Sequence, residues 1–150
     1  MTQVPYPYKR LESKRYIFIS DGKKRIAKVV DFVPLGMGNI FNLGFGDLLP
    51  DGSMDDKINS NNGDIIKVLA TIVDILKHFT TQYPQAEIYF QGSSKERSKL
   101  YTRIVKTYYS IFSKEFAIAC VLESKKDIQI LPYDPRVDKE YLGFLIKRIS

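Results

Sequence analysis

The feature that most constrains the fold is a short apolar run, Glu87 to Phe90, followed by a turn at Gly92 and a long amphipathic segment. Apolar side chains recur in this segment at intervals of three and four residues, which places them on one side of a helix. They are Leu100, Tyr101, Ile104, Val105, Tyr108, Ile111 and Phe112. The sequence therefore predicts a strand, a turn and then a helix of which one face is buried.

The turn carries a pattern that is typical of a helix start. Ser93 is followed three residues later by Glu96. In such a capping box the Ser93 hydroxyl accepts a hydrogen bond from the amide of Glu96, while the Glu96 carboxylate accepts one from the amide of Ser93. This pattern predicts that the helix begins at about Ser94.

The charged residues of this helix divide into two groups. A row that we call the basic face lies opposite the apolar arc and consists of Lys95, Lys99, Arg103 and Lys106. Arg97 falls inside the apolar arc instead, where an unpaired guanidinium would cost several kcal/mol. We therefore expect a partner for Arg97, and the candidates are the carboxylates of Asp47 and Asp64, each beside a glycine.

Two interpretations of the turn remain open. In the first, Ser93, Ser94 and Arg97 form an anion or phosphate site with the free amides of the helix N-terminus, which favours negative charge by its geometry and dipole. In the second, the serines only cap the helix and Arg97 has a structural role. The second situation is the more common, and Glu96 would compete with a bound anion. The run GSSKER lacks the glycine spacing and the ending of a P-loop.

The rest of the chain predicts one α+β domain over residues 1–150. Residues 1–15, with Pro5 and Pro7, predict an irregular lead-in. Polar residues 48–62 predict a loop, and a helix is expected from Asn62-Gly63-Asp64 to Tyr83-Pro84. Further strands are expected at 16–20, 25–33, 39–47, 116–122 and 128–131. Residues 141–149 favour a closing strand, with a short helix as the alternative.

The predicted order is three strands, a helix, a strand, a second helix and then two or three strands. Strands grouped with helices in this way favour a mostly antiparallel sheet with both long helices packed on one face. In the third strand, Gly44 and Gly46 alternate with apolar residues, which indicates a close backbone approach or a bulge.

Composition narrows the classes of function. The net charge of +6 favours contact with an acidic partner protein or nucleic acid. No run approaches the roughly 20 apolar residues of a membrane helix. The N-terminus also lacks the apolar centre of a signal peptide. We therefore expect a cytoplasmic protein with no membrane contact.

The inventory of metal-binding side chains is small. With Cys120 as its one cysteine and His78 as its one histidine, a single chain cannot build a zinc site of the usual kind. The acidic residues of the 48–62 loop do not follow the EF-hand spacing. No cofactor motif is complete, so we expect no metal and no cofactor, and the oligomeric state is not predicted.

Several short segments share a combined pattern. They are Phe41 to Asp47 (FNLGFGD), Asn61 to Asp64 (NNGD), Lys67 to Thr71 (KVLAT), Tyr83-Pro84, and Gly92-Ser93 with Arg97, Leu100, Tyr101, Arg103 and Ile104. From about Tyr16 to the C-terminus, the combination resembles a family of small uncharacterised bacterial proteins, largely from Bacteroidetes, a domain of unknown function. The resemblance implies a standalone single-domain protein and a linked set of Asp47, Asp64 and Arg97. It implies no established activity. The turn reads Ser-Lys-Glu-Arg where the family pattern has Thr-Pro-Ala-Arg.

Two hypotheses of function follow, from different classes. The first is a binding protein that uses the basic face and the turn to hold an acidic protein or nucleic acid. The alternative is a small phosphate-directed enzyme, such as a metal-assisted nuclease or the toxin of a toxin-antitoxin pair. In that enzyme Asp47, Asp64 and also Asp51 would hold a divalent ion, and Arg97 would stabilise developing negative charge. A structural or regulatory subunit whose partner is encoded nearby is a third hypothesis.

Overall fold

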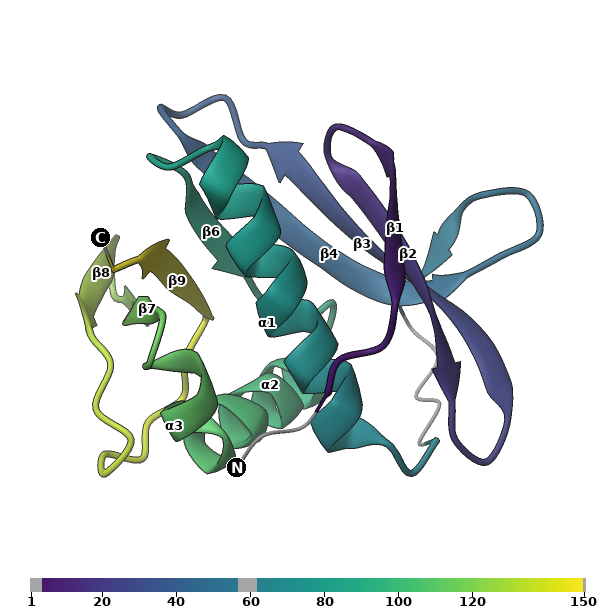
Figure 1. The fold of residues 1–150 in the computed structure, drawn as a ribbon. Helices are drawn as coiled ribbons and strands as arrows, with labels where there is room; N and C mark the ends of the chain where they lie inside the picture. The colour runs from purple at the N-terminus through teal and green to yellow at the C-terminus, as the bar shows by residue number, and fades with distance from the viewer. Residues whose placement is uncertain (1–3, 57–61, 150) are drawn as a thin grey trace.

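The computed structural model describes residues 4–56 and 62–149, and in these residues nine strands form one sheet beside three helices (Figure 1). The strands are β1 (Tyr8–Glu12), β2 (Arg15–Asp21), β3 (Arg25–Pro34), β4 (Ile40–Leu48), β5 (Met54–Asp55), β6 (Glu87–Phe90), β7 (Phe116–Ser124), β8 (Asp127–Pro132) and β9 (Gly143–Arg148). The helices are α1 (Ile65–Gln82), α2 (Lys95–Thr107) and α3 (Tyr109–Phe112).

The strands are ordered β1-β2-β3-β4-β6-β9-β7-β8, and β5 pairs with β4 outside this path. Every pair is antiparallel except β4 with β6, which is parallel. A parallel pair needs a crossover connection, and α1 supplies it here. The predicted mostly antiparallel sheet is confirmed, and the closing strand expected at 141–149 is β9, which lies between β6 and β7.

The N-terminal segment corrects one prediction. Residues 8–12 of the predicted irregular lead-in form β1, an edge strand paired with β2. Pro5 and Pro7 precede this strand, and a proline before an edge strand removes no ladder hydrogen bond. The segment is also held on α1, because the Tyr6 amide donates to Thr71 Oγ1 at 2.8 Å and Tyr8 Oη donates to Asp74 Oδ2 at 2.7 Å.

The predicted loop 48–62 also contains secondary structure. Met54–Asp55 forms β5 on β4, while residues 57–61 of that loop lie outside the described residues. A Cβ atom at Gly46 would lie 2.5 Å from the carbonyl oxygen of Asp55. Gly46 therefore allows the close backbone approach that the alternating glycines predicted.

The main core lies between α1 and one face of the sheet. Phe79 of α1 is fully buried and stacks on Phe32 of β3, with ring centroids 3.9 Å apart, and its edge contacts Phe41 of β4. Figure 1 shows α1 lying across the sheet, with β2 to β4 on one side of it and β7 to β9 on the other. The strand registers place the buried residues Tyr16, Val30, Ile88 and Ile146 on this same face.

The second long helix is shorter than predicted. The helix expected to run from Ser94 to Phe112 ends at Thr107, and a four-residue helix, α3, follows after Tyr108. The run Thr107-Tyr108-Tyr109 combines β-branched and aromatic residues of low helix propensity, which favours a break there. The break lets Phe112 enter the main core while Tyr109 packs on Tyr133, with ring centroids 5.8 Å apart.

A smaller cluster holds the C-terminal part of the chain. Val105 of α2 and Cys120 of β7 are buried there together with three aromatic residues, Tyr133, Tyr141 and Phe144. The ring centroids of these three lie 5.4 to 5.6 Å from one another. This aromatic cluster fixes the irregular segment between β8 and β9 against α2.

We predict that Phe79→Ala lowers the free energy of unfolding by about 3–5 kcal/mol, because it removes a fully buried ring and leaves a cavity. Urea denaturation followed by circular dichroism measures this loss. Ile128→Ala is the control, since Ile128 is 57% exposed on the edge strand β8 and its truncation should change stability by less than about 0.5 kcal/mol. Similar losses in both variants would contradict the assigned core.

Candidate functional site

The turn before α2 packs unusually close to the helix. A Cβ atom at Gly92 would lie 2.2 Å from the backbone nitrogen of Ser98, so only glycine fits at this position. The Gly92 amide donates to Ser98 Oγ at 3.2 Å. The first turn of α2 therefore folds back on the end of β6.

The predicted capping box does not form in the expected register. The N-cap is Ser94, whose hydroxyl accepts from the amide of Arg97 at 3.3 Å, and the helix starts at Lys95. The residue three positions after Ser94 is Arg97, so no carboxylate stands in the place that a reciprocal box requires. Ser93 is exposed in the turn and lines neither of the clefts described below.

Helix α2 separates two clefts. Lys95, Ser98, Lys99 and Thr102 line the first, which we call the polar cleft. Arg97, Leu100, Ile104 and Tyr108 line the second, which we call the amphipathic cleft. At about 100° per residue these two sets lie on opposite sides of the helix. Ser94 and Arg97, predicted to form one anion site, therefore face different clefts.

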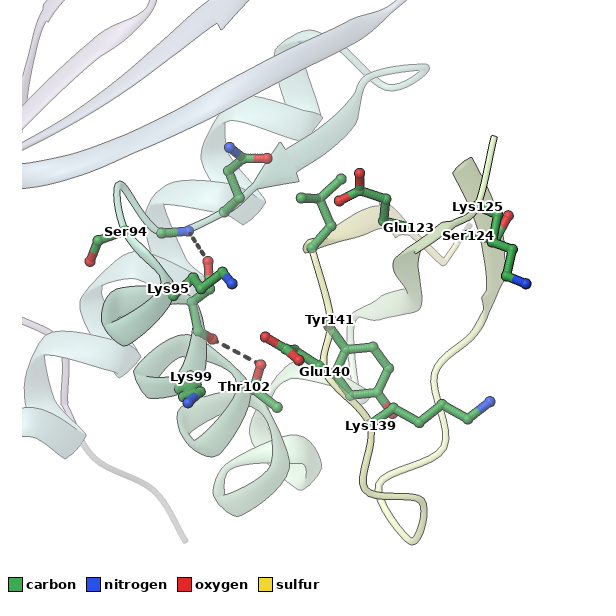
Figure 2. A pocket seen from close by; sticks show the side chains of 14 residues that line it. Ser94, Lys95, Lys99, Thr102, Glu123, Ser124, Lys125, Lys139, Glu140 and Tyr141 are labelled. Carbon is green, nitrogen blue, oxygen red and sulfur yellow. Dashed lines mark hydrogen bonds between the residues drawn. The ribbon is translucent and has the colours of Figure 1, made fainter. Parts of the chain in front are cut away.

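The polar cleft has a volume of about 720 Å³ and lies between α2, the β7-β8 turn and residues 139–142. Figure 2 shows Lys95 and Lys99 on the α2 wall and Lys139, Glu140 and Tyr141 on the facing segment. The Glu140 carboxylate points toward Thr102, whereas the Lys139 amine points away from α2 (Figure 2). Burial raises the pKa of Tyr141, which is 6% exposed and donates to the carbonyl oxygen of Val137 at 3.1 Å.

The four residues of the predicted basic face have separate surroundings. Lys95 and Lys99 line the polar cleft, whereas Arg103 lines the amphipathic cleft. Lys106 forms an ion pair with Asp138, with Nζ and Oδ1 2.6 Å apart. Both side chains are well exposed, so this pair contributes at most about 1 kcal/mol, but it ties α2 to the facing segment.

The amphipathic cleft has a volume of about 530 Å³ and lies between β4, the start of α1 and α2. It brings together the three residues of the predicted linked set: Asp47, Asp64 and Arg97 all line it. Its floor is apolar, with Phe45, Val68 and Ile104, and these three residues also border an adjoining apolar cavity of about 90 Å³.

The expected ion pair of Arg97 with Asp47 or Asp64 is not formed. Asp47 pairs instead with Lys28, its direct neighbour across the β3-β4 ladder, and Oδ1 and Nζ lie 2.5 Å apart. Both side chains of this pair are largely buried, at 13% and 8% exposure. A cross-strand neighbour is held at contact distance by the sheet itself, so Lys28 is the partner that the fold provides.

Asp64 belongs to a polar network at the start of α1. It is the N-cap residue of α1, but its carboxylate makes no cap hydrogen bond. Its Oδ2 accepts from Tyr6 Oη at 2.6 Å and from Ser20 Oγ at 2.5 Å. Burial and the hydrogen bond to Asp64 raise the pKa of Tyr6. The side-chain amide of the buried Asn62 also donates to Ser20 Oγ, at 2.9 Å. This network joins the N-terminal segment, β2 and α1.

The carboxylates do not assemble a metal site in the described part of the chain. Asp51 lies in an exposed turn, where its Oδ1 accepts from the amide and the hydroxyl of Ser53. It therefore lies apart from Asp47 and Asp64 in the amphipathic cleft. Within residues 4–56 and 62–149, no three His, Cys, Asp or Glu side chains are grouped to hold a metal ion.

Sequence reasoning missed the residues that face α2 from other elements. Lys125, Lys139 and Glu140 line the polar cleft, and Asp56 lines the amphipathic cleft. No local motif marks any of them, because each is brought to α2 by the sheet order. Only the insertion of β9 between β6 and β7 would have indicated that residues 139–142 lie beside α2.

A comparison with protein-family models gives one match, which extends over residues 2–149. The chain belongs to the family of unknown function DUF6934. The resemblance to a domain of unknown function is thus confirmed over almost the whole chain. No curated protein and no solved structure was found to match it. Among the described helices of this family member, none is long and apolar enough to span a membrane.

We predict that Asp47→Asn lowers the free energy of unfolding by about 3 kcal/mol, because it removes one charge of a largely buried ion pair. Urea denaturation measures this loss. Glu12→Gln, which removes an exposed carboxylate of β1, is the control and should change stability by less than about 0.5 kcal/mol.

The same variant tests the metal-assisted alternative. If Asp47 has a structural role, magnesium leaves the melting temperature of the wild type and of Asp47→Asn unchanged. A melting temperature that magnesium raises in the wild type but not in the variant would contradict the structural assignment and support a carboxylate-bound divalent ion.

Proposed function

We propose that this chain is a binding protein that holds an acidic segment of a partner protein in the polar cleft. The observation that carries the proposal is the charge of the cleft lining, where four lysines stand against two glutamates. Two of the lysines, Lys95 and Lys99, come from α2, and the other two come from the β7-β8 turn and the segment before β9.

The cleft is an opening between rigidly held walls. Gly92 and Ser98 fix the start of α2 against β6, and Tyr133 and Tyr141 fix the facing segment in the aromatic cluster. A site whose walls are already placed loses less conformational entropy when a ligand binds. All four lysine side chains are exposed, with Lys139 pointing away from α2, so their charges attract an acidic partner before contact.

A protein partner fits the lining better than nucleic acid. Glu140 points toward α2 and Glu123 lines the same cleft, so a continuous phosphate backbone would meet two negative charges. The aromatic residue of the lining, Tyr141, is 6% exposed and offers no open face for base stacking. A protein segment can place carboxylates beside the lysines and a hydrogen-bond donor beside Glu140.

The phosphate-directed enzyme is the weaker alternative. In such an enzyme a divalent ion would share Asp47 with Lys28 and Asp64 with Tyr6 and Ser20, which already engage one oxygen of each carboxylate. No separate observation favours it, and the magnesium experiment on Asp47→Asn remains its test.

We predict that Lys95→Glu/Lys99→Glu weakens the binding of a fluorescent poly-L-glutamate peptide by at least about tenfold, which corresponds to about 1.4 kcal/mol. Fluorescence anisotropy at low and moderate salt measures this loss. The matched control is Lys9→Glu/Lys114→Glu, which makes the same change of net charge at exposed positions outside both clefts. Equal weakening by both double variants would contradict a defined site and indicate attraction by net charge alone.

Two further arms sharpen the experiment. Glu140→Gln should strengthen peptide binding, because it removes a negative charge that faces α2. A single-stranded oligonucleotide with the same number of negative charges should bind more weakly than the peptide. An oligonucleotide that binds more tightly, and loses affinity in Lys95→Glu/Lys99→Glu, would replace the acidic protein with nucleic acid as the partner.

A further inference from the structure

The amphipathic cleft on the other side of α2 has no role in the proposed function, and its volume of about 530 Å³ lies in the range of small-molecule sites, roughly 300–1,000 Å³. Its lining combines an apolar floor with charged groups of both signs. Such a combination is typical of sites for small organic ligands, in which an apolar surface gives affinity and a few polar groups fix orientation.

Two opposite charges in this cleft lack an ion-pair partner in the described residues. Arg97 of α2 and Asp56, just after β5, are both half-buried in the lining. Within residues 4–56 and 62–149, no salt bridge involves either of them, and the hydrogen bond from Arg97 to Ser94 comes from the backbone amide rather than from the guanidinium. Removing part of a charge from water without giving it a partner costs free energy. A ligand that supplies the opposite charge would recover part of this cost and bind more tightly.

Both charges lie in the same cleft as the phenol of Tyr101. Burial raises the pKa of the Tyr101 phenol, and the Arg97 cation lowers it while the Asp56 anion raises it. Arg97, Asp56 and Tyr101 all line the cleft, and Arg97 and Asp56 form no ion pair with each other. A ligand that carries both an anionic and a cationic group can contact both charges at once.

The cations and the anions that line this cleft come from different elements of the fold. Arginines Arg97 and Arg103 come from α2, whereas Asp56 and Asp64 come from the opposite wall. Asp64 already accepts two hydrogen bonds through Oδ2. Among the described residues, the one cation of that opposite wall, Lys28, is paired with Asp47, so its remaining charge is negative and the α2 wall is positive. This separation of charge orients a dipolar ligand across the cleft.

The apolar end of the site is the cavity of about 90 Å³ that adjoins the cleft. It is lined almost wholly by apolar side chains of β4, α1 and α2, among them Leu69 and Val105 in addition to the floor residues. Filling such a space with an apolar group removes apolar surface from water on both sides of the contact, which is the general source of affinity in apolar pockets.

From this arrangement we infer that the amphipathic cleft binds an apolar zwitterion, a free amino acid or a short peptide with a large apolar side chain. The carboxylate of the ligand pairs with Arg97, the ammonium group pairs with Asp56, and the side chain lies on Phe45 and Ile104 and enters the apolar cavity. The site lies on the opposite side of α2 from the polar cleft, so this inference stands without the proposed function.

Isothermal titration calorimetry on the full chain tests the inference with four probes. L-phenylalanine and the dipeptide L-phenylalanyl-L-phenylalanine carry both charges, 3-phenylpropionate carries only the carboxylate, and 2-phenylethylamine carries only the ammonium group. We expect at least one of the zwitterions to bind about tenfold or more tightly than both single-charge probes. The tighter of the two zwitterions identifies the source as an amino acid or a peptide.

Variants assign the two contacts. Arg97→Gln should remove the preference for the zwitterion over 2-phenylethylamine, and Asp56→Asn should remove its preference over 3-phenylpropionate. The controls Lys147→Gln and Glu12→Gln remove exposed charges outside the cleft and should leave every affinity unchanged. Urea denaturation of each variant shows that the fold is retained.

Three results would overturn the inference. The first is no binding of either zwitterion by the folded wild type. The second is equal affinity for the zwitterions and the single-charge probes, which would show that apolar contact alone decides binding. The third is unchanged selectivity in both Arg97→Gln and Asp56→Asn.

Discussion

The stack of Phe79 on Phe32 is the contact on which the remaining structure depends. It holds α1 against the sheet while the chain crosses from β4 to the parallel strand β6, and a parallel pair cannot form without such a crossover. Because β6 ends directly before Gly92, the position of α1 also sets where α2 begins. An aromatic pair buried between α1 and the sheet therefore helps to decide where the two clefts lie, although neither ring lines them.

Helix α2 uses its two sides differently. One side carries exposed lysines toward a polar opening, and the other carries Arg97 beside apolar residues that continue into the core. The exposed lysines keep their hydration until a partner arrives, so they favour fast and salt-sensitive association. Arg97 is half-buried, so its interactions are less screened and favour a specific, well-fitted ligand. The two proposals therefore assign two kinds of recognition to opposite sides of one helix.

The sequence predicted best those features that depend on residues close to one another in the chain. The apolar spacing predicted α1, and the alternating glycines of β4 predicted a close backbone approach or a bulge, because burial and close approach depend on neighbouring residues. It was least informative where a contact depends on sheet order. The spacing indicated that Arg97 needs a partner, with Asp47 and Asp64 as candidates, but it could not show that Lys28 is the neighbour of Asp47 across the ladder. Nor could it show that Tyr6, from a segment expected to be irregular, would engage Asp64.

The central claim is that α2 separates two independent sites, and amide chemical-shift mapping of the labelled full chain tests it most directly. A poly-L-glutamate peptide should shift the amides of residues 139–142, whereas L-phenylalanyl-L-phenylalanine should shift those of Asn62, Gly63 and Asp64, which lie on the opposite wall of the other cleft. Both sets of shifts should persist when the two ligands are added together. Shifts of one common set by both ligands, or displacement of one ligand by the other, would contradict the account.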